Sequence, residues 1–237
     1  MTSTKTNVAK KILSDDNYEK IWSVDDFKKF DRPNVLKAFS DLQKENVIKR
    51  IKRGYYYRPK MTILGEITFD TYSLAIARIK KKSSFHCISG ISGYNQIGLT
   101  TQVPNITEIA CDCDARNYNN IVYLKRRKPV DGGAIERIIL DSIIDIKTIP
   151  DTTVEKSILK IKDMIKNNKV SLFSLVKSAF YESPRVKAVI GAIAEEFEFD
   201  KKPLDKLKTS LNPVSMIYLN TGNALIYAKK WQIVPER

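Results

Sequence analysis

The 237-residue sequence contains few of the residues on which several protein classes depend. It has a single histidine, so a Ser-His-Asp site has only His86 to draw on. Its three cysteines are an odd number and too few for a disulfide framework, which predicts a reducing compartment. Nine glycines and nine prolines exclude a collagen-like or low-complexity chain.

Long apolar stretches are also missing. No run approaches the ~18 residues of a membrane span, and residues 1–11 lack the apolar segment of a signal peptide. We therefore expect a cytoplasmic protein with no membrane partner. The sequence also has no glycine-rich phosphate-binding loop of the Walker type.

Positive charge is abundant and is concentrated near the N-terminus. The chain has 41 Lys and Arg against 27 Asp and Glu, a formal net charge of +14. Residues 1–60 hold 15 of the basic and 8 of the acidic residues, so half of the excess lies in about a quarter of the chain. Dense positive charge on a small domain is typical of nucleic-acid binding, although a solvated lysine-rich surface gives the same count.

The first 45 residues carry the periodicity of three helices. Val8, Ile12 and Leu13 recur at helical spacing. Ser23 and Asp26 have the spacing of a capping box at the start of a short second helix. Asp31 and Pro33 suit the start of a third helix. Its predicted inner stripe is Val35, Leu36, Phe39 and Leu42, and its predicted outer face is Asn34, Lys37, Ala38, Asp41 and Lys44.

A basic and aromatic hairpin is predicted after the third helix. Residues 47–52 have strand character, Arg53 and Gly54 form a turn signal, and three tyrosines before Arg58 suggest a second strand. Three helices followed by a hairpin is the order of a winged helix-turn-helix domain. The predicted fold class is therefore α+β, with a winged helix-turn-helix domain over residues 1–60 and a mixed α+β domain over residues 61–237.

This arrangement suits a reader of double-stranded DNA. The third helix would enter the major groove, where Arg bonds guanine and Asn bonds adenine, each worth ~1–3 kcal/mol of discrimination. The hairpin would meet phosphates or the minor groove. A protein-docking role for the same domain is the alternative, which the high charge of the hairpin disfavours. The predicted DNA-binding residues are Arg32, Asn34, Lys37, Lys49, Arg50, Lys52, Arg53 and Tyr55.

Four segments resemble the AbiEi-type antitoxins of abortive-infection, type IV toxin–antitoxin systems. Residues 21–27 are similar to the entry of that family's second helix, and residues 36–42 with 47–56 are similar to its recognition helix and wing. The most distinctive resemblance lies outside this domain, in Ile97-Gly98-Leu99-Thr100-Thr101-Gln102-Val103-Pro104. The resemblance implies a bacterial antitoxin that represses its own operon by binding a promoter inverted repeat and counteracts a nucleotidyltransferase-like toxin.

Two other kinds of function remain open at this point. One is a stand-alone winged-helix transcription factor, or a plasmid-replication DNA-binding protein, without a toxin partner. The other is a metal-dependent nuclease or transferase, in which Asp112 and Asp114 would hold Mg²⁺. The supporting glycine-serine turn of a nucleotidyltransferase occurs only in reversed order, as Ser92 and Gly93. We therefore expect no enzyme activity.

A zinc site is a further alternative, which the spacing disfavours. His86, Cys87, Cys111 and Cys113 are four conceivable ligands. Adjacent residues rarely bind one ion together, and Cys-X-Cys is not the usual Cys-X-X-Cys pattern. We expect no metal and no cofactor. The sequence does not determine the oligomeric state, the operator, or the role of Cys111-Asp112-Cys113-Asp114.

Overall fold

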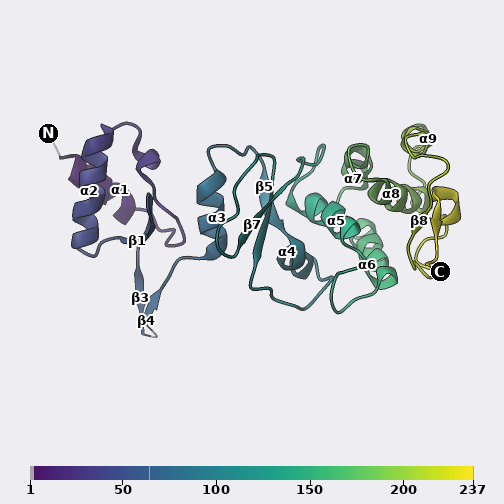
Figure 1. Ribbon diagram of the computed structural model, residues 1–237, viewed down its shortest axis with the longest axis horizontal. Coiled ribbons are helices and arrows are strands. Elements are labelled where there is room, and N and C mark those ends of the chain that lie inside the picture. The colour runs from purple at the N-terminus through teal and green to yellow at the C-terminus, as the bar shows by residue number, and fades with distance from the viewer. Residues whose placement is uncertain (1–2, 64, 237) are drawn as a thin grey trace. The chain divides into compact units, whose positions relative to one another are not determined.

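The computed structural model describes residues 3–63 and 65–236 and has a mixed α+β architecture (Figure 1). The chain divides into two compact units, residues 1–81 and 82–237. The predicted boundary at residue 60 falls inside the first unit, in strand β3 (Lys60–Thr62), which follows β2 (Tyr55–Tyr57). Over the described ranges, no helix is long and apolar enough to cross a bilayer.

The first unit begins with two helices joined by a short helical turn. Helix α1 spans Thr4–Leu13 and is capped by Ser3, whose Oγ accepts a hydrogen bond from Thr6 N at 3.2 Å. The expected second helix is a single 3₁₀ turn, η1 (Val24–Phe27). Helix α2 spans Arg32–Lys44 and carries Pro33 in its first turn, where the missing N–H costs nothing. Strands β1 (Lys49–Lys52) and β2 then form the antiparallel hairpin that the sequence predicts.

An aromatic cluster holds these elements together. The ring of Phe39, on α2, lies 5.6 Å from Phe27 and 4.8 Å from Tyr56. Trp22 lies 5.7 Å from Phe27 and joins β2 through two backbone hydrogen bonds with Tyr56, of 2.7 and 2.9 Å. Phe39 therefore links α2 to both η1 and the hairpin. The rest of this core comprises Val8, Ile12, Val24, Val35, Ala38, Leu42 and Ile48.

A second hairpin follows where the sequence suggests only a linker. The breaker Gly65 makes residues 61–66 look like a plain connection in the sequence, but β3 pairs with β4 (Gly65–Ile67) in an antiparallel ladder. Gly65 has φ of 111°, which a residue with a side chain rarely adopts, and this allows the tight turn. Figure 1 shows this hairpin projecting away from α1 and α2. The unit ends with helix α3 (Thr71–Ile79), which Asp70 caps.

The second unit is built on a three-stranded sheet. Strands β5 (His86–Ser89), β6 (Thr107–Cys111) and β7 (Ile121–Lys125) lie in that order, with β5–β6 antiparallel and β6–β7 parallel. Strands β6 and β7 lie in the short strand-like runs of residues 106–111 and 121–124. Helix α4 (Gly90–Gln96) follows β5 directly. Gly90 at their junction has φ of 58° and leaves no room for a Cβ beside Glu108.

Helices make up most of the remainder of this unit. They are α5 (Ala134–Ile144), α6 (Val154–Lys166), α7 (Leu172–Ala179), α8 (Pro184–Glu196) and α9 (Lys201–Thr209). The short parallel pair β8 (Ile217–Tyr218) and β9 (Ile233–Val234) and the turn η2 (Lys229–Trp231) complete the fold. Trp231 is buried against α8, where only the absent side chain of Gly191 lets the indole approach the helix backbone.

A buried ionic cluster connects the sheet to these helices. Asp141 on α5 is 1% exposed and accepts hydrogen bonds from Ser89, Arg126 and Arg137 at 2.8 to 2.9 Å. Arg137, also 1% exposed, donates to Glu182 at 2.6 Å. Because a buried charge without a partner is costly, these contacts fix β5, α5 and the segment after α7 relative to one another.

Candidate nucleic-acid interface

Helix α2 presents a polar face to solvent. Val35, Ala38 and Leu42 are buried on the opposite side of the helix. Residues three and four apart share a helix face, so Lys37, Ser40 and Lys44 form a line along the exposed side, and all three are exposed. Sequence reasoning named only Lys37 among the site residues, although the same periodicity identifies Ser40 and Lys44.

Two residues of α2 lie on the side opposite to the predicted one. Leu36 was expected in the apolar stripe but is 48% exposed, whereas Ala38 was expected outside but is buried at 2% exposure. At ~100° per residue, Ala38 lies ~40° from Leu42 and ~60° from Val35, whereas Leu36 lies ~100° from Val35 and ~120° from Leu42. The position of a residue around the helix therefore decides which residue is buried, even though Leu36 has a larger apolar side chain than Ala38.

The N-terminal end of α2 places the predicted base-reading residues at the surface. Arg32, Asn34 and Lys37 are all exposed. Arg32 Nη1 lies 3.2 Å from Asp25 Oδ1, and Asp25 is also paired with Lys81. The hydrogen bond from Lys81, followed by the contact with Arg32, lowers the pKa of Asp25, which keeps this carboxylate charged. Arg32 is thus already engaged by an acidic group.

The hairpin lies next to α2 in the packing of the first unit. Its register pairs Lys49 with Tyr57, Arg50 with Tyr56 and Lys52 with Tyr55, with an irregularity between Arg50 and Lys52. Tyr56 is buried beneath the hairpin and contacts Phe39 of α2. Such a bulge increases the local twist of a strand, and here it separates the exposed Arg50 from the half-buried Lys52.

The basic side chains of the hairpin differ in how they are engaged. Arg50 and Arg53 are exposed and, within the described parts of the chain, neither side chain has a hydrogen-bond or ion-pair partner. Lys52 Nζ lies 4.9 Å from the ring centre of Tyr55, and burial, followed by the charge of Arg78, lowers the pKa of Lys52. Arg50 and Arg53 are therefore the more available of these cations.

Lys49 and Tyr57 are tied to the second hairpin. Both contact Glu66 of β4, Lys49 through an ion pair and Tyr57 through a 2.8 Å hydrogen bond from its hydroxyl. Burial, followed by the bond to Glu66, raises the pKa of Tyr57 to about 12. Glu66 therefore braces one hairpin against the other, a contact that sequence reasoning did not anticipate.

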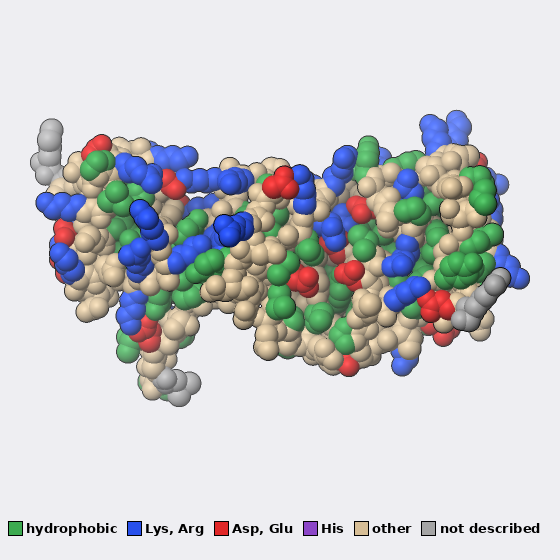
Figure 2. All heavy atoms as spheres, viewed as in Figure 1, with side chains coloured by type: hydrophobic (Ala, Val, Ile, Leu, Met, Phe, Trp, Pro, Cys, Tyr) green, Lys and Arg blue, Asp and Glu red, His purple; other side chains and the backbone are tan. Residues whose placement is uncertain are grey.

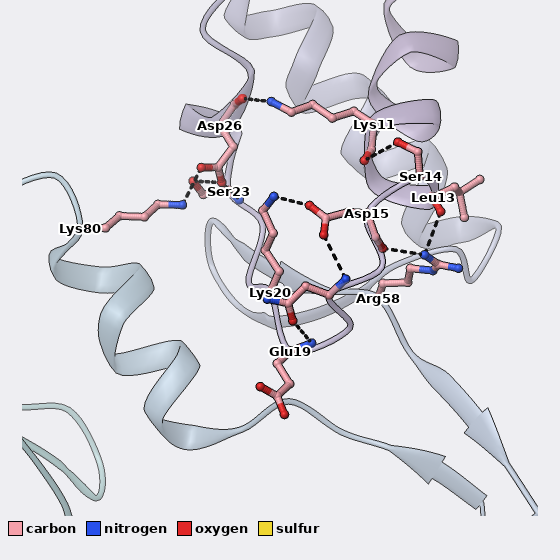
Figure 3. Close-up of polar contacts among 11 residues, drawn as sticks. Lys11, Leu13, Ser14, Asp15, Glu19, Lys20, Ser23, Asp26, Arg58 and Lys80 are labelled. Atoms are coloured by element: carbon pink, nitrogen blue, oxygen red, sulfur yellow. Dashed lines mark hydrogen bonds and ion pairs between the residues drawn. The ribbon is translucent and has the colours of Figure 1, made fainter. Parts of the chain in front are cut away.

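Several further cations of the first unit have structural contacts (Figure 3). Arg58 Nη1 donates to the carbonyl oxygens of Leu13 at 2.9 Å and Asp15 at 3.2 Å. Lys20 pairs with Asp15, and Lys11 Nζ donates to the carbonyl oxygen of Asp26 at 2.8 Å. These contacts fix the connection between α1 and η1. Figure 2 shows Lys and Arg side chains crowded over this unit, yet many of them serve the fold rather than a ligand.

The residues of the alternative metal sites have other partners. Asp112 accepts hydrogen bonds from Ser83 Oγ at 2.6 Å and Ser84 N at 3.0 Å, whereas Asp114 pairs with Lys125 at 2.6 Å. In the portion of the molecule that the structure describes, no three His, Cys, Asp or Glu side chains are grouped so that they could hold a metal ion.

Comparison with known proteins places the chain in a family. No curated protein matches it at a significant level. Among solved structures, it is similar to the RV2827C protein from Mycobacterium tuberculosis, with 10% identity, a TM-score of 0.53, and coverage of 100% of this chain and 92% of that one. This likeness concerns the fold alone. The model of the family of unknown function DUF6088 matches residues 7–197, and the chain therefore belongs to that family.

Proposed function

We propose that the first unit is a winged helix-turn-helix domain that binds double-stranded DNA in a sequence-specific manner. Helix α1, the turn η1 and helix α2 supply the helical part, and β1–β2 is the wing. The observation that carries the proposal is the polar face of α2, which is open to solvent beside a hairpin with two unengaged arginines.

Base recognition would come from the N-terminal half of α2. Asn34 can form two hydrogen bonds to adenine, and Arg32 can do the same to guanine after exchanging Asp25 for the base. Lys37 lies one turn further along the same helix. Lys44, near the C-terminal end, is better placed for a phosphate than for a base, because the N-terminal residues of a recognition helix approach the base edges.

The wing would supply contacts that do not depend on sequence. Arg50 and Arg53 would bind phosphates directly, since neither must first give up a carboxylate among the described residues. The other three predicted wing residues would mainly stabilise the hairpin rather than bind DNA. Lys49 is paired with Glu66, and Lys52 lies over the ring of Tyr55.

The direct test is selection from a library of duplexes with a randomised core, using the full chain. We expect enrichment of a defined motif. Asn34→Ala should relax the preference at one position by roughly 1–3 kcal/mol while leaving total affinity less affected. Asn105→Ala, an exposed asparagine of the second unit, is the matched control. Recovery of no motif, with unchanged weak binding to all duplexes, would refute sequence-specific recognition.

We further propose that the protein is an antitoxin that represses its own operon and counteracts a nucleotidyltransferase-like toxin. The support is the resemblance of residues 97–104. In this segment, Thr100, Thr101 and Gln102 donate side-chain hydrogen bonds to Asp151 at 3.5, 3.1 and 3.4 Å. Val103, the next residue, is 87% exposed. The segment is therefore held in one conformation and remains accessible to a partner.

Co-expression with a nucleotidyltransferase encoded next to this chain tests that role. Rescue of growth by the full chain is the expected result. Val103→Asp should weaken rescue without altering DNA binding, and Val214→Asp, another exposed valine of the second unit, should leave both unchanged. DNA binding without rescue would instead favour the stand-alone transcription factor.

A further inference from the structure

Cys111 and Cys113 bring two thiols together at one end of the sheet. Cys111 is the last residue of β6, and Cys113 lies in the bend that follows. Their Sγ atoms are 3.9 Å apart, and the Cys111 thiol also approaches the Cys113 carbonyl oxygen at 3.4 Å. We propose that these two residues form a reversible intramolecular disulfide, which makes the Cys-Asp-Cys turn a redox modification site.

The geometry allows this bond to close by a small movement. A disulfide has an S–S length of ~2.05 Å, so the sulfur atoms must approach by just under 2 Å from the observed 3.9 Å. Cys111 is fixed because it pairs with both His86 and Lys125 in the sheet. Cys113 lies beyond the last ladder pair of β6, so its side chain can move without breaking the sheet.

The third cysteine is poorly placed to compete. Cys87 pairs with Ala110 on β6, and successive residues of a strand point to opposite faces. Its side chain therefore lies on the other face of the sheet from that of Cys111. It is also buried at 2% exposure, and burial is the main cause that raises the pKa of its thiol to about 12. Cys87 serves as an internal reference for reactivity.

Glutathione disulfide, a low-mass disulfide oxidant, can complete the chemistry in two exchanges. The thiolate of the half-buried Cys113 attacks the oxidant, which forms a mixed disulfide and releases one glutathione thiolate. The Cys111 thiolate then attacks the Cys113 sulfur, which forms the ring and releases the second glutathione thiolate. In total, the two protein thiols lose two electrons to glutathione disulfide, and their two protons pass to the two released glutathione thiolates. Because burial raises the pKa of Cys111 to about 11, the second exchange should be the slower one.

A basic side chain lies beside the buried thiol. His86 is the ladder partner of Cys111, and paired residues share a face of the sheet with their Cβ atoms ~5 Å apart. Within residues 3–63 and 65–236, the buried Nδ1 of His86 has no hydrogen-bond partner. The His86 side chain therefore lies on the same face of the sheet as Cys111, with a buried polar atom that no described residue engages.

The residue between the two cysteines connects this site to the start of the second unit. The Asp112 carboxylate holds Ser83 and Ser84, and Asp112 N donates to the Phe85 carbonyl oxygen at 3.2 Å. Closing the ring would draw Asp112 toward a new backbone conformation. The oxidation state of the turn would therefore be transmitted to residues 83–85, where this unit begins.

The test uses the full chain, glutathione disulfide and an alkylating reagent added after denaturation. Reduced protein should be alkylated at three cysteines and oxidised protein at Cys87 alone. Cleavage after Glu108 separates Cys87 from the pair, so the peptide of residues 109–136 should lack two hydrogens and regain them on treatment with dithiothreitol.

Two variants make the result decisive. Cys87→Ala should still form the ring, whereas Cys113→Ser should not, and circular dichroism checks that each is folded. Loss of two of the three alkylation sites, confined to residues 109–136, supports the proposal. Three retained sites, a stable glutathione adduct on Cys113 without ring closure, a bond that includes Cys87, or a covalent dimer would each overturn it.

Discussion

If the first unit binds DNA as proposed, removing the two unengaged arginines of the β1–β2 hairpin should change the salt dependence of that binding. Arg50 and Arg53 are exposed and, as far as the structure describes the chain, have no acidic partner. The double variant Arg50→Ala/Arg53→Ala should therefore lose two phosphate contacts without exposing a buried charge. Because neither side chain belongs to the aromatic core, the variant should fold as the parent does.

The magnitude follows from the release of counterions. Each neutralised phosphate contributes a slope of about −0.9 to the plot of log affinity against log salt. If Lys44, Arg50 and Arg53 each neutralise one, the parent should have a slope of about −2.7 and the double variant about −0.9. Between about 50 and about 200 mM salt, the ratio of parent to variant affinity should then fall roughly tenfold.

Fluorescence anisotropy with a labelled mixed-sequence duplex measures both slopes. Lys156→Ala/Lys166→Ala, which removes two exposed lysines of α6 in the second unit, is the control of equal charge. Its slope should match that of the parent. An unchanged slope in the Arg50→Ala/Arg53→Ala variant would show that these arginines do not neutralise phosphates. An equal reduction in the control would show that overall charge rather than the hairpin determines binding.

Three further predictions concern the fold and its titratable groups. Phe39→Ala should lower the unfolding free energy of the first unit by ~3–5 kcal/mol, because it leaves a cavity in the aromatic core. Urea titrations measure this loss, and a loss below ~1 kcal/mol would contradict the prediction. Hydrogen bonds, first from Ser83, lower the pKa of Asp112 to about 2. The ionised Asp112 carboxylate should therefore stabilise the fold above about pH 4, and this contribution should be lost as the pH falls toward 2. An NMR titration midpoint of Asp112 near the ordinary value of 3.8 would refute this prediction. Gly191→Ala should displace Trp231, because the new Cβ would lie 2.2 Å from the indole. The tryptophan fluorescence emission should then shift to longer wavelength, and an unchanged spectrum would count against this packing.

The order of elements in the first unit could be predicted because each has a local signal. The capping pair of Ser23 and Asp26 is present, with Ser23 N donating to Asp26 Oδ2 at 2.7 Å. The hairpin has its turn at Gly54, with φ of 86°. The second element is only a 3₁₀ turn, which an apolar periodicity over so few residues cannot distinguish from an α-helix.

The second hairpin and the ion pairs had no such signal. Met61 and Ile67 are 72% and 51% exposed, so no buried face gives β3 and β4 the alternation of a half-buried strand. The bond between Glu66 and Lys49 joins residues 17 positions apart, and only the folded chain brings them together. Sequence reasoning therefore identified the basic residues of the β1–β2 hairpin but not which of them were already engaged.

This distinction limits what the charge excess can mean for binding. A cation that is paired with a carboxylate in the free protein, as Arg32 is with Asp25 and Lys49 is with Glu66, must exchange one anion for another when it meets a phosphate. Such an exchange adds little binding free energy, because the exposed ion pair that is lost and the phosphate contact that replaces it have similar free energies. Unengaged cations release counterions without that compensation. If this unit binds DNA as proposed, its binding strength should therefore depend on where its unengaged cations lie, among them Lys37 and Lys44 on α2 and Arg50 and Arg53 on the hairpin, rather than on its net charge.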